Sequence, residues 1–384
     1  MTARADLDPL EEFRCFTIAH PLLLEMKERL LSAIKSAAPG SLILVLGPTG
    51  VGKTTLRLKV EQLLTQALLP SLESDRGRIP FVSVNTMAPL NGNFSWKDHF
   101  ARLLRQMNEP LIDDKLNGER NSRGQFTSAP RAGFELQYAV EQALHYRRPV
   151  AVFLDEAQHL GRIASGRKLA DQLDVVKSMA SQTKIVHVLL GTYELLAFRN
   201  LSGQLSRRSL DIHFRRYRCE DTRDLEIFRN ILLTFQAQFP LPEPCDLSLW
   251  MDLLYERSIG CVGILKEWLM RALAAALAEG KRTLHKRHLE ETALLTSQCE
   301  RILIEAREGE VRLNEDDASR SRLRNLLGIK EAIETPADSQ AQRHSPVRAK
   351  GRCARRNPKR DKIGLPEPAY AWLKDLQPAG PSIS

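Results

Sequence analysis

The most specific chemical signal in the sequence is a glycine-rich loop suited to a bound phosphate. Residues 47–54 read Gly-Pro-Thr-Gly-Val-Gly-Lys-Thr, a full match to the pattern G-x-x-x-x-G-K-[ST]. Such a loop wraps a phosphate in backbone amides at the positive end of the following helix. Lys53 would neutralise charge on the β- and γ-phosphates, and the Thr54 hydroxyl would coordinate Mg²⁺. The loop predicts ATP and Mg²⁺ as cofactors, with these nucleotide contacts: Gly47, Pro48, Thr49, Gly50, Val51, Gly52, Lys53, Thr54 and Thr55.

A pair of acids at the end of an apolar run supplies the second part of this chemistry. Residues 150–154 are all apolar and lead directly into Asp155 and Glu156. Asp155 would hold Mg²⁺ through its water shell, and Glu156 would act as the general base that polarises the attacking water. A strand that merely reaches solvent is the alternative interpretation, but acids at a buried edge need a partner. Beside the phosphate loop, the pair indicates nucleotide hydrolysis.

Two further sites are suited to the γ-phosphate. The run 184–190 leads into Gly191 and Thr192, and the carboxyl ends of parallel strands converge on the ligand crevice. The Thr192 hydroxyl would bond the γ-phosphate or the attacking water, although a helix cap is the alternative. Arg207 and Arg208 would grip phosphate oxygens in a planar, bidentate manner, and an arginine from a neighbouring subunit would make hydrolysis depend on assembly. A solvated basic turn is the alternative for the two arginines.

Short apolar runs are expected to position these residues. Four of them lie at 41–46, 80–85, 150–154 and 184–190. Each is continuous rather than alternating, which is typical of parallel strands buried on both faces. Helical or loop segments separate the runs, so the pattern indicates βαβ units and a parallel sheet covered by helices. We expect a fifth strand over 211–217 and a helix over 21–36, ahead of the sheet.

The second half of the chain has a different pattern. A period of 3.6 residues predicts helices over 221–239, 247–257, 263–278 and 284–307. Residues 343–362 hold nine Lys or Arg against one acid, which predicts a disordered basic tail. The class is therefore α/β. We expect a nucleotide-binding domain with an N-terminal helix over 1–219, an all-α lid domain over 220–310, a helical extension over 311–334 and the tail over 335–384.

Charge and composition narrow the possible partners. The 384 residues carry 56 Lys or Arg against 47 acids, a net charge of +9, which suits a polyanion partner. Residues 343–384 carry +7 of this charge, so the expected folded domains are nearly neutral. No apolar run approaches the roughly 18 residues of a membrane span, the N-terminus lacks a signal-peptide core, and the six cysteines form no C-x-x-C pair. A cytoplasmic protein without a membrane partner is expected.

In this order, the motifs resemble those of the AAA+ ATPases, a fold with a P-loop parallel sheet between helices and an all-α lid. Within them the chain looks most like the TniB/TnsC regulators of DNA transposition over residues 15–300. The residues that carry this likeness are Ile18–Pro21, Leu154–Leu160 and Leu190–Thr192.

The resemblance implies assembly with ATP into a homo-oligomeric ring or helical filament around duplex DNA. Such an assembly would mark a target site and recruit the transposase, with a target-selection protein as a further partner. Two other AAA+ classes stay open: a replication-initiator-like ATPase, and a signalling or secretion-type ATPase that has protein partners only.

The lid departs from the AAA+ pattern at one position. Many AAA+ lids carry Gly-x-x-Arg, whose arginine touches the γ-phosphate, whereas residues 260–263 read Gly-Cys-Val-Gly. Lys266 follows on the same helix face and would substitute, with a solvated lysine as the equal alternative. Loss of the arginine would suit slow, assembly-dependent hydrolysis.

The expected DNA contacts lie in the insertion 87–132, the part that tends to face the central channel in AAA+ assemblies. Lys97, Arg120 and Arg123 are the candidates for phosphate contacts that read no bases. Acidic residues in the same stretch make an ordinary mixed-charge surface the alternative.

Overall fold

The computed structural model of the chain describes residues 9–89, 94–110, 112, 132–161, 166–199, 209–314 and 317–329. Two units are distinguished, Met1–Ser321 and Arg322–Ser384, and the sheet and candidate site lie in the first. Four predicted site residues lie outside the described residues, as does the predicted tail over 335–384. These are Arg120, Arg123, Arg207 and Arg208.

Five parallel strands form the predicted sheet. They are β1 (Leu42–Leu46), β2 (Phe81–Asn85), β3 (Ala151–Asp155), β4 (Val186–Gly191) and β5 (Ser209–His213). The strand order is β2-β3-β4-β1-β5, and every neighbouring pair is parallel. The four predicted strands and their parallel arrangement are thus confirmed. Burial at every position holds for β1, β3 and β4 but not for β2, an edge strand whose burial alternates. The fifth strand ends before its predicted boundary, because the chain leaves the sheet after His213 and Tyr217 N–H bonds the Gly260 carbonyl instead (3.0 Å).

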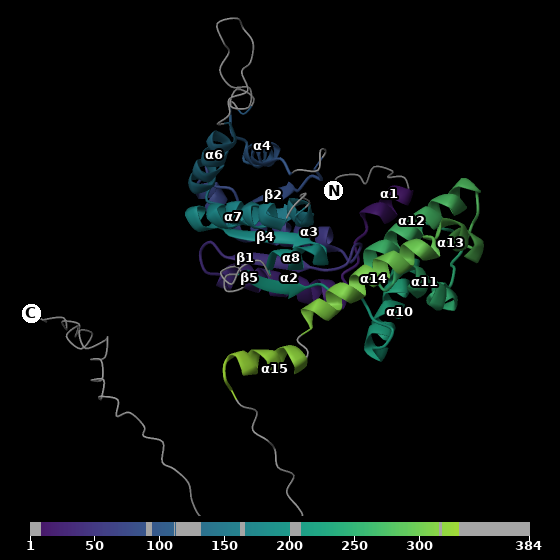
Figure 1. Cartoon of the computed structure of the whole chain (residues 1–384). Helices are drawn as coiled ribbons and strands as arrows, with labels where there is room; N and C mark the ends of the chain where they lie inside the picture. The colour runs from purple at the N-terminus through teal and green to yellow at the C-terminus, as the bar shows by residue number, and fades with distance from the viewer. Residues whose placement is uncertain are drawn as a thin grey trace, which may run out of the picture. The chain divides into compact units, whose positions relative to one another are not determined.

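Helices cover both faces of the sheet, as expected (Figure 1). α2 (Pro21–Ser36) and α3 (Lys53–Ser74) pack on one face, and α4 (Trp96–Gln106), α6 (Ala132–Arg147) and α7 (Gly166–Thr183) pack on the other. All five β1 side chains are buried, but alternate residues enter the two different cores. A strand covered on both faces needs apolar residues at every position, which explains the continuous run in the sequence.

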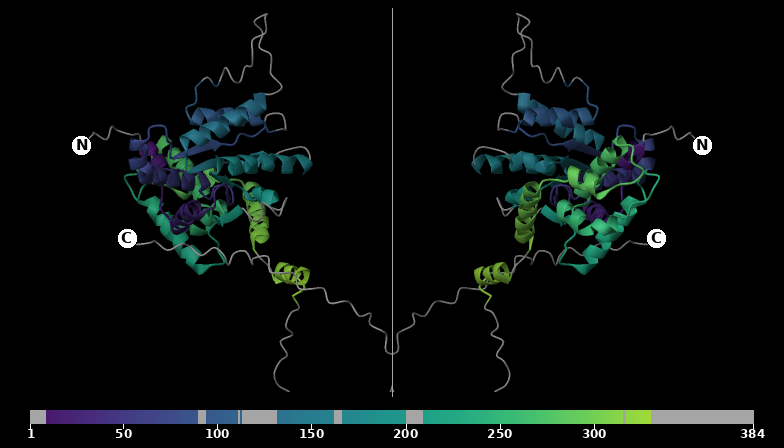
Figure 2. Two further views of the ribbon diagram at one scale, coloured as in Figure 1. Left: turned by 90° about the vertical axis from the view of Figure 1, so that its left-hand side faces the viewer. Right: turned by 90° about the vertical axis from the view of Figure 1, so that its right-hand side faces the viewer.

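A helical region follows β5, and Figure 2 shows it beside the layered sheet region. Its helices are α10 (Thr222–Gln236), α11 (Met251–Ser258), α12 (Val262–Ala278), α13 (Lys286–Thr292) and α14 (Thr296–Leu313). The Asp221 side chain caps α10 by accepting from Arg223 N–H at 2.9 Å. The remaining short elements are α1 (Pro9–Cys15), η1 (Ala157–Gly161), η2 (Tyr193–Leu195), α8 (Leu196–Arg199), η3 (Leu247–Trp250) and α15 (Asp317–Leu326). No described helix is both long and apolar enough to cross a membrane.

The predicted single helix over 284–307 is wrong, because the chain forms α13 and α14 with a break between them. Side chains from other helices bond the carbonyls around this break. Trp268 Nε1 donates to the Leu289 carbonyl at 2.9 Å, and an Arg257 guanidinium nitrogen donates to the Leu294 carbonyl at 3.2 Å. These donors from other helices replace hydrogen bonds within the helix at the break. Residues 284–307 contain no proline or glycine, so the local sequence does not indicate that a helix ends there.

α1 packs against the helical region rather than against the sheet. Phe13 is 1% exposed, and its ring meets those of Phe235 and Phe239 edge-on, at centroid distances of 6.0 and 5.3 Å. The N-terminal segment therefore belongs to the core that the helical region builds.

Three buried histidines make the fold sensitive to acid. His20, His99 and His187 are at most 4% exposed, and burial lowers the pKa of each to about 4. Their pKa in the unfolded chain is about 6.5, so the unfolded chain takes up protons first as the pH falls. Stability from these residues is therefore complete above neutral pH and is lost as the pH drops towards 4.

We expect the free energy of unfolding, measured with urea, to fall between about pH 7.5 and about pH 5.5 by roughly 1 kcal/mol for each of these histidines. A His187→Leu variant should lose one such step from its pH dependence. The same pH dependence in that variant and in the wild type would contradict a neutral, buried His187.

Candidate nucleotide-binding site

The phosphate loop, Asp155, Glu156 and Thr192 meet at one edge of the sheet. Strand register pairs Leu46 with Gly191, and Gly47 N–H donates to the Gly191 carbonyl at 3.3 Å. Asp155 ends β3 beside β4, so the phosphate loop, the two acids and Thr192 all follow the carboxyl ends of neighbouring strands. Parallel strands converge on a ligand crevice at this edge.

Glycines shape the loop between β1 and α3. Gly50 and Gly52 have φ of 74° and 111°, the left-handed region that glycine adopts without strain. A Cβ at Gly47 would lie 2.3 Å from the Phe214 carbonyl oxygen, so this position has no room for a side chain. Gly263 N–H at the start of α12 donates to the Gly50 carbonyl at 2.7 Å. The loop is therefore held between β5 and the helical region.

Lys53 is a buried cation among neutral acceptors. Its side chain is 6% exposed, and Nζ donates to the carbonyls of Gly47 (3.1 Å) and Pro48 (2.9 Å). Burial lowers its pKa, while the charges of Glu156 and Asp155 act in the opposite direction. Within the described part of the chain, no carboxylate forms an ion pair with Lys53. A buried ammonium with only neutral acceptors fits an anionic ligand such as phosphate.

Thr54 and Asp155 provide oxygen atoms that fit Mg²⁺. Thr54 Oγ1 donates to Asp155 Oδ2 at 3.0 Å, and Asp155 is 3% exposed. The other carboxylate oxygen, Oδ1, accepts from Glu156 N–H at 3.0 Å. A hydroxyl next to a carboxylate is the donor set that Mg²⁺ prefers, often through its own waters.

Asp155 also forms an ion pair that the motifs do not predict. Arg57, one turn after Thr54 on α3, donates from Nε to Asp155 Oδ2 at 3.1 Å. A lone arginine in a helix gives no sequence signal for such a contact, because the partner lies 98 residues away.

Glu156 and Thr192 are joined through Gln158, a second residue that the motif analysis did not assign. Gln158 Nε2 donates to Glu156 Oε2 at 2.5 Å, and its Oε1 accepts from Thr192 N–H at 3.3 Å. A Cβ at Gly191 would lie 2.4 Å from that Oε1, so glycine leaves room for the amide. Thr192 Oγ1 is buried without a hydrogen-bond partner among the described residues. Its hydroxyl is therefore available to a ligand.

Lys266 lies on a different side of the loop. Its Nζ donates to the Arg14 carbonyl at 2.7 Å, at the end of α1. Lys266 lines a small pocket between the loop, the segment before α2, and α12, together with Thr17, Ile18, His20, Leu23, Val51, Gly52, Thr55, Phe235, Val262 and Gly263. Thr54, Asp155, Glu156 and Thr192 do not line this pocket.

α14 closes the opposite side, where it borders a cavity of about 380 Å³ with Thr49 and Thr192. The 6%-exposed Glu310 accepts from Arg216 Nε at 3.1 Å and pairs with Arg218 at 3.3 Å. Gly309 packs directly on the ring of Tyr193, the residue after Thr192. The last helix of the helical region is thereby attached to the sheet beside the site.

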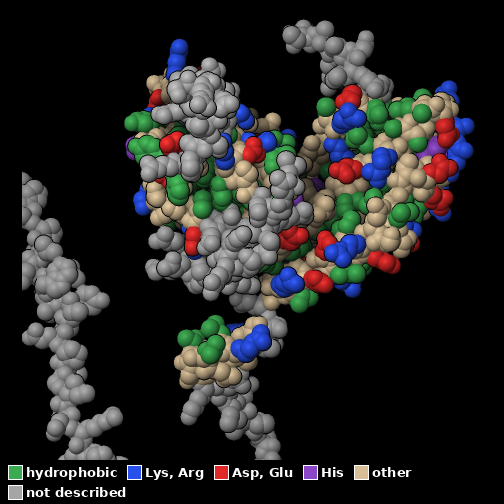
Figure 3. Space-filling view, turned by 45° about the horizontal axis from the view of Figure 1, so that its top comes forward, with side chains coloured by type: hydrophobic (Ala, Val, Ile, Leu, Met, Phe, Trp, Pro, Cys, Tyr) green, Lys and Arg blue, Asp and Glu red, His purple; other side chains and the backbone are tan. Residues whose placement is uncertain are grey.

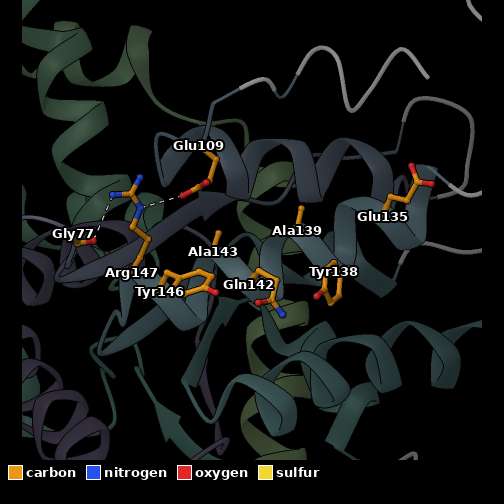
Figure 4. Close-up of a pocket in the computed structure, with 9 residues that line it drawn as sticks. All are labelled: Gly77, Glu109, Glu135, Tyr138, Ala139, Gln142, Ala143, Tyr146 and Arg147. Carbon is orange, nitrogen blue, oxygen red and sulfur yellow. Dashed lines mark hydrogen bonds and ion pairs between the residues drawn. The ribbon is translucent and has the colours of Figure 1, made fainter. Parts of the chain in front are cut away.

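A larger cavity lies elsewhere among the described residues. It has a volume of about 650 Å³ and is lined by α6, Gly77 and Glu109, with Tyr138 and Tyr146 along it and an Arg147–Glu109 ion pair of 3.1 Å (Figure 4). None of the predicted site residues lines it. Lys97, the described candidate for DNA contact, is in the first turn of α4, on the same side of the sheet as α6.

Comparisons with known proteins agree with this architecture. Residues 37–198 match the family model described as an AAA domain. The chain is similar to the ADP form of the ORC2 protein of Aeropyrum pernix, with a TM-score of 0.50 and 18% identity over 73% of this chain and 71% of that one. The ADPNP-ADP complexes of the Aeropyrum pernix ORC2 protein give a TM-score of 0.49 and 19% identity over 75% of this chain and 71% of that one.

Cdc6p from Pyrobaculum aerophilum gives a TM-score of 0.46 and 16% identity over 74% of this chain and 70% of that one. No curated protein matches the sequence. The domain match and the sheet together establish the α/β fold of the AAA+ ATPases.

The contact between Gly309 and Tyr193 can be tested by a single methyl group. A Cβ at Gly309 would lie 2.0 Å from the Tyr193 ring, so Gly309→Ala should lower the free energy of unfolding by about 1–3 kcal/mol. Gly133→Ala in α6 is the matched control, because a Cβ there meets nothing within 4 Å. It should be neutral or stabilising by up to about 1 kcal/mol. Equal urea midpoints for the two variants would contradict close packing of α14 on Tyr193.

Proposed function

We propose that the chain is an ATPase that regulates DNA transposition: it assembles with ATP on duplex target DNA and recruits the transposase. The observation that supports nucleotide binding and hydrolysis is the hydrogen bond from Thr54 Oγ1 to Asp155. Thr54 follows the buried Lys53 in the sequence, and Asp155 precedes Glu156, the candidate base. Lys53 and Thr54 come from the start of α3, and Asp155 and Glu156 come from the end of β3, which supplies the groups that phosphoryl transfer to water needs.

Each side chain has a distinct task in the proposed reaction. Lys53 exchanges its carbonyl acceptors for β- and γ-phosphate oxygens, and the loop amides take the remaining charge. Thr54 and Asp155 would hold Mg²⁺, which would neutralise phosphate charge. Glu156 accepts a proton from the attacking water, Gln158 fixes the carboxylate, and the Thr192 hydroxyl bonds the γ-phosphate or that water.

The pocket beside Lys266 has a volume of about 50 Å³, so it would have to widen to take the base and ribose of the nucleotide. Ile18, Val51 and Val262 give it apolar walls next to the loop, on the side away from Asp155. Lys266 would then contact the nucleotide from the base side, rather than replace the γ-phosphate arginine of other AAA+ lids.

The transposition part rests on the likeness of Ile18–Pro21 and Leu154–Leu160 to TniB/TnsC proteins. Self-assembly would bring Arg207 or Arg208 of one subunit to the γ-phosphate of the next. Lys97, Arg120 and Arg123 would contact DNA phosphates, and repetition around the oligomer would multiply these few contacts. On the face shown in Figure 3, basic and acidic side chains are interspersed over the helical region.

A replication-initiator-like ATPase is the second candidate. The observation that favours it is the fold similarity to the ORC2 protein of Aeropyrum pernix, at a TM-score of 0.50. An initiator would be expected to select particular DNA sequences. The proposed regulator would coat duplex DNA without sequence preference.

Two substitutions separate nucleotide binding from hydrolysis. Lys53→Ala should weaken ATP binding by roughly 100-fold or more, because it removes the buried cation. Glu156→Gln should leave binding within a few-fold and lower kcat by about 100-fold or more, because an amide cannot act as the base. Lys59→Ala, an exposed lysine on the same helix, is the control and should change neither quantity. Unchanged turnover in Glu156→Gln would exclude Glu156 as the base.

Electron microscopy with duplex DNA tests the assembly. With a non-hydrolysable ATP analogue, rings or helical filaments should form on DNA of arbitrary sequence, and the Lys53→Ala variant should form none. DNA affinity should fall steeply with salt, because phosphate contacts release counterions. A chain that stays monomeric with ATP and DNA would contradict the transposition proposal, and binding confined to one sequence would favour the initiator.

A further inference from the structure

Arg57 has no role in the motifs, yet its guanidinium contacts three elements at the site. The side chain is 16% exposed. Nε donates to Asp155 Oδ2 at 3.1 Å, at the end of β3, and Nη1 donates to Ser83 Oγ on β2 at 2.7 Å. Nη1 also donates to Glu61 Oε1 on α3 at 2.6 Å. The guanidinium therefore joins α3 to two neighbouring strands.

Arg57 and the Thr54 hydroxyl use the same oxygen of Asp155. Oδ2 accepts from Thr54 Oγ1 and from Arg57 Nε, while Oδ1 accepts from Glu156 N–H. Oδ2 is thus the carboxylate oxygen that lies next to the metal ligand candidate Thr54, and a fixed positive charge already lies against it. A guanidinium stays protonated at any relevant pH, so its charge cannot be removed when a metal ion arrives.

The two sets of contacts come from different nitrogens. Asp155 is bonded by Nε, whereas Glu61 and Ser83 are bonded by Nη1. If Asp155 turns towards a cation, Arg57 keeps an anionic partner and a hydroxyl, so it is not left as an uncompensated buried charge. Glu61 is itself only 7% exposed, so water screens the Arg57–Glu61 ion pair little and the pair holds the guanidinium in place.

We propose that Arg57 is a resident countercharge for Asp155 that sets the Mg²⁺ dependence of nucleotide binding. Without Mg²⁺, the guanidinium compensates Asp155 and adds positive charge near the phosphates, so nucleotide binds even when the metal is scarce. With Mg²⁺, the same charge repels the ion and weakens its binding. This inference rests on the proposed nucleotide site, and it adds a positioning residue that acts on the metal through Asp155.

The quantity that reports on this role is a ratio of two affinities. The ratio is the dissociation constant of a fluorescent, non-hydrolysable ATP analogue measured in EDTA, divided by its dissociation constant measured in saturating Mg²⁺. Removing the charge should weaken binding in EDTA and tighten the binding of the ion, so Arg57→Gln should raise the ratio by roughly tenfold. The Mg²⁺ concentration at half-saturation should fall by a similar factor.

Two further variants distinguish this role from a structural ion pair. Arg57→Lys keeps the charge and should retain a ratio close to that of the wild type. Glu61→Gln removes the other acidic partner of Arg57 without touching Asp155, so it should not raise the ratio, although it lowers the melting temperature.

The measurement is equilibrium binding to the full-length chain, with thermal melting of each variant recorded in parallel. A raised ratio in Arg57→Gln, with ratios near that of the wild type in Arg57→Lys and Glu61→Gln, supports the proposal. A lower melting temperature with an unchanged ratio in Arg57→Gln overturns it and leaves a structural ion pair. If the wild-type chain does not bind the analogue at all, the proposed function fails as well, and this outcome is distinct from the previous one.

Discussion

The structure depends on how buried charges are compensated at the carboxyl edge of the sheet. Lys53 and Asp155 are 6% and 3% exposed. Lys53 follows β1 through the loop, Asp155 ends β3, and both strands are buried on both faces. Burying an ion costs several kcal/mol unless partners surround it. Two backbone carbonyls accept hydrogen bonds from Lys53. Thr54, Arg57 and the Glu156 N–H donate hydrogen bonds to Asp155. The positive group is the less well compensated of the two, so the edge is prepared for an anion.

The helical region reaches this edge from two sides. On one side, Gly263 of α12 bonds the loop carbonyl of Gly50. On the other, α14 places Glu310 between Arg216 and Arg218 and packs Gly309 on Tyr193. The segments that contact the nucleotide loop and Thr192 are therefore attached to different helices of one region. A change in one contact could therefore be transmitted to the other through that region, as the proposed nucleotide-dependent assembly requires.

Much of the fold could be predicted from sequence, because its signals are local. Continuous apolar runs predicted the strands, and the glycine pattern marked the loop between β1 and α3. The break between α13 and α14 could not be predicted, since donors from Trp268 and Arg257 create it across the fold. The contacts of Arg57 and Gln158 were missed for the same reason. Both residues are ordinary helix or turn residues whose importance arises only when distant strand ends meet.

If this edge is a nucleotide site, Lys53 exchanges its two carbonyl acceptors for phosphate oxygens when ATP binds. A crystal or cryo-electron microscopy structure with a non-hydrolysable ATP analogue and Mg²⁺ tests it most directly. The triphosphate should lie within the loop 47–54, with Lys53 Nζ moved from the carbonyls of Gly47 and Pro48 onto phosphate oxygens. A nucleotide bound elsewhere, with Lys53 still on those two carbonyls, would contradict it.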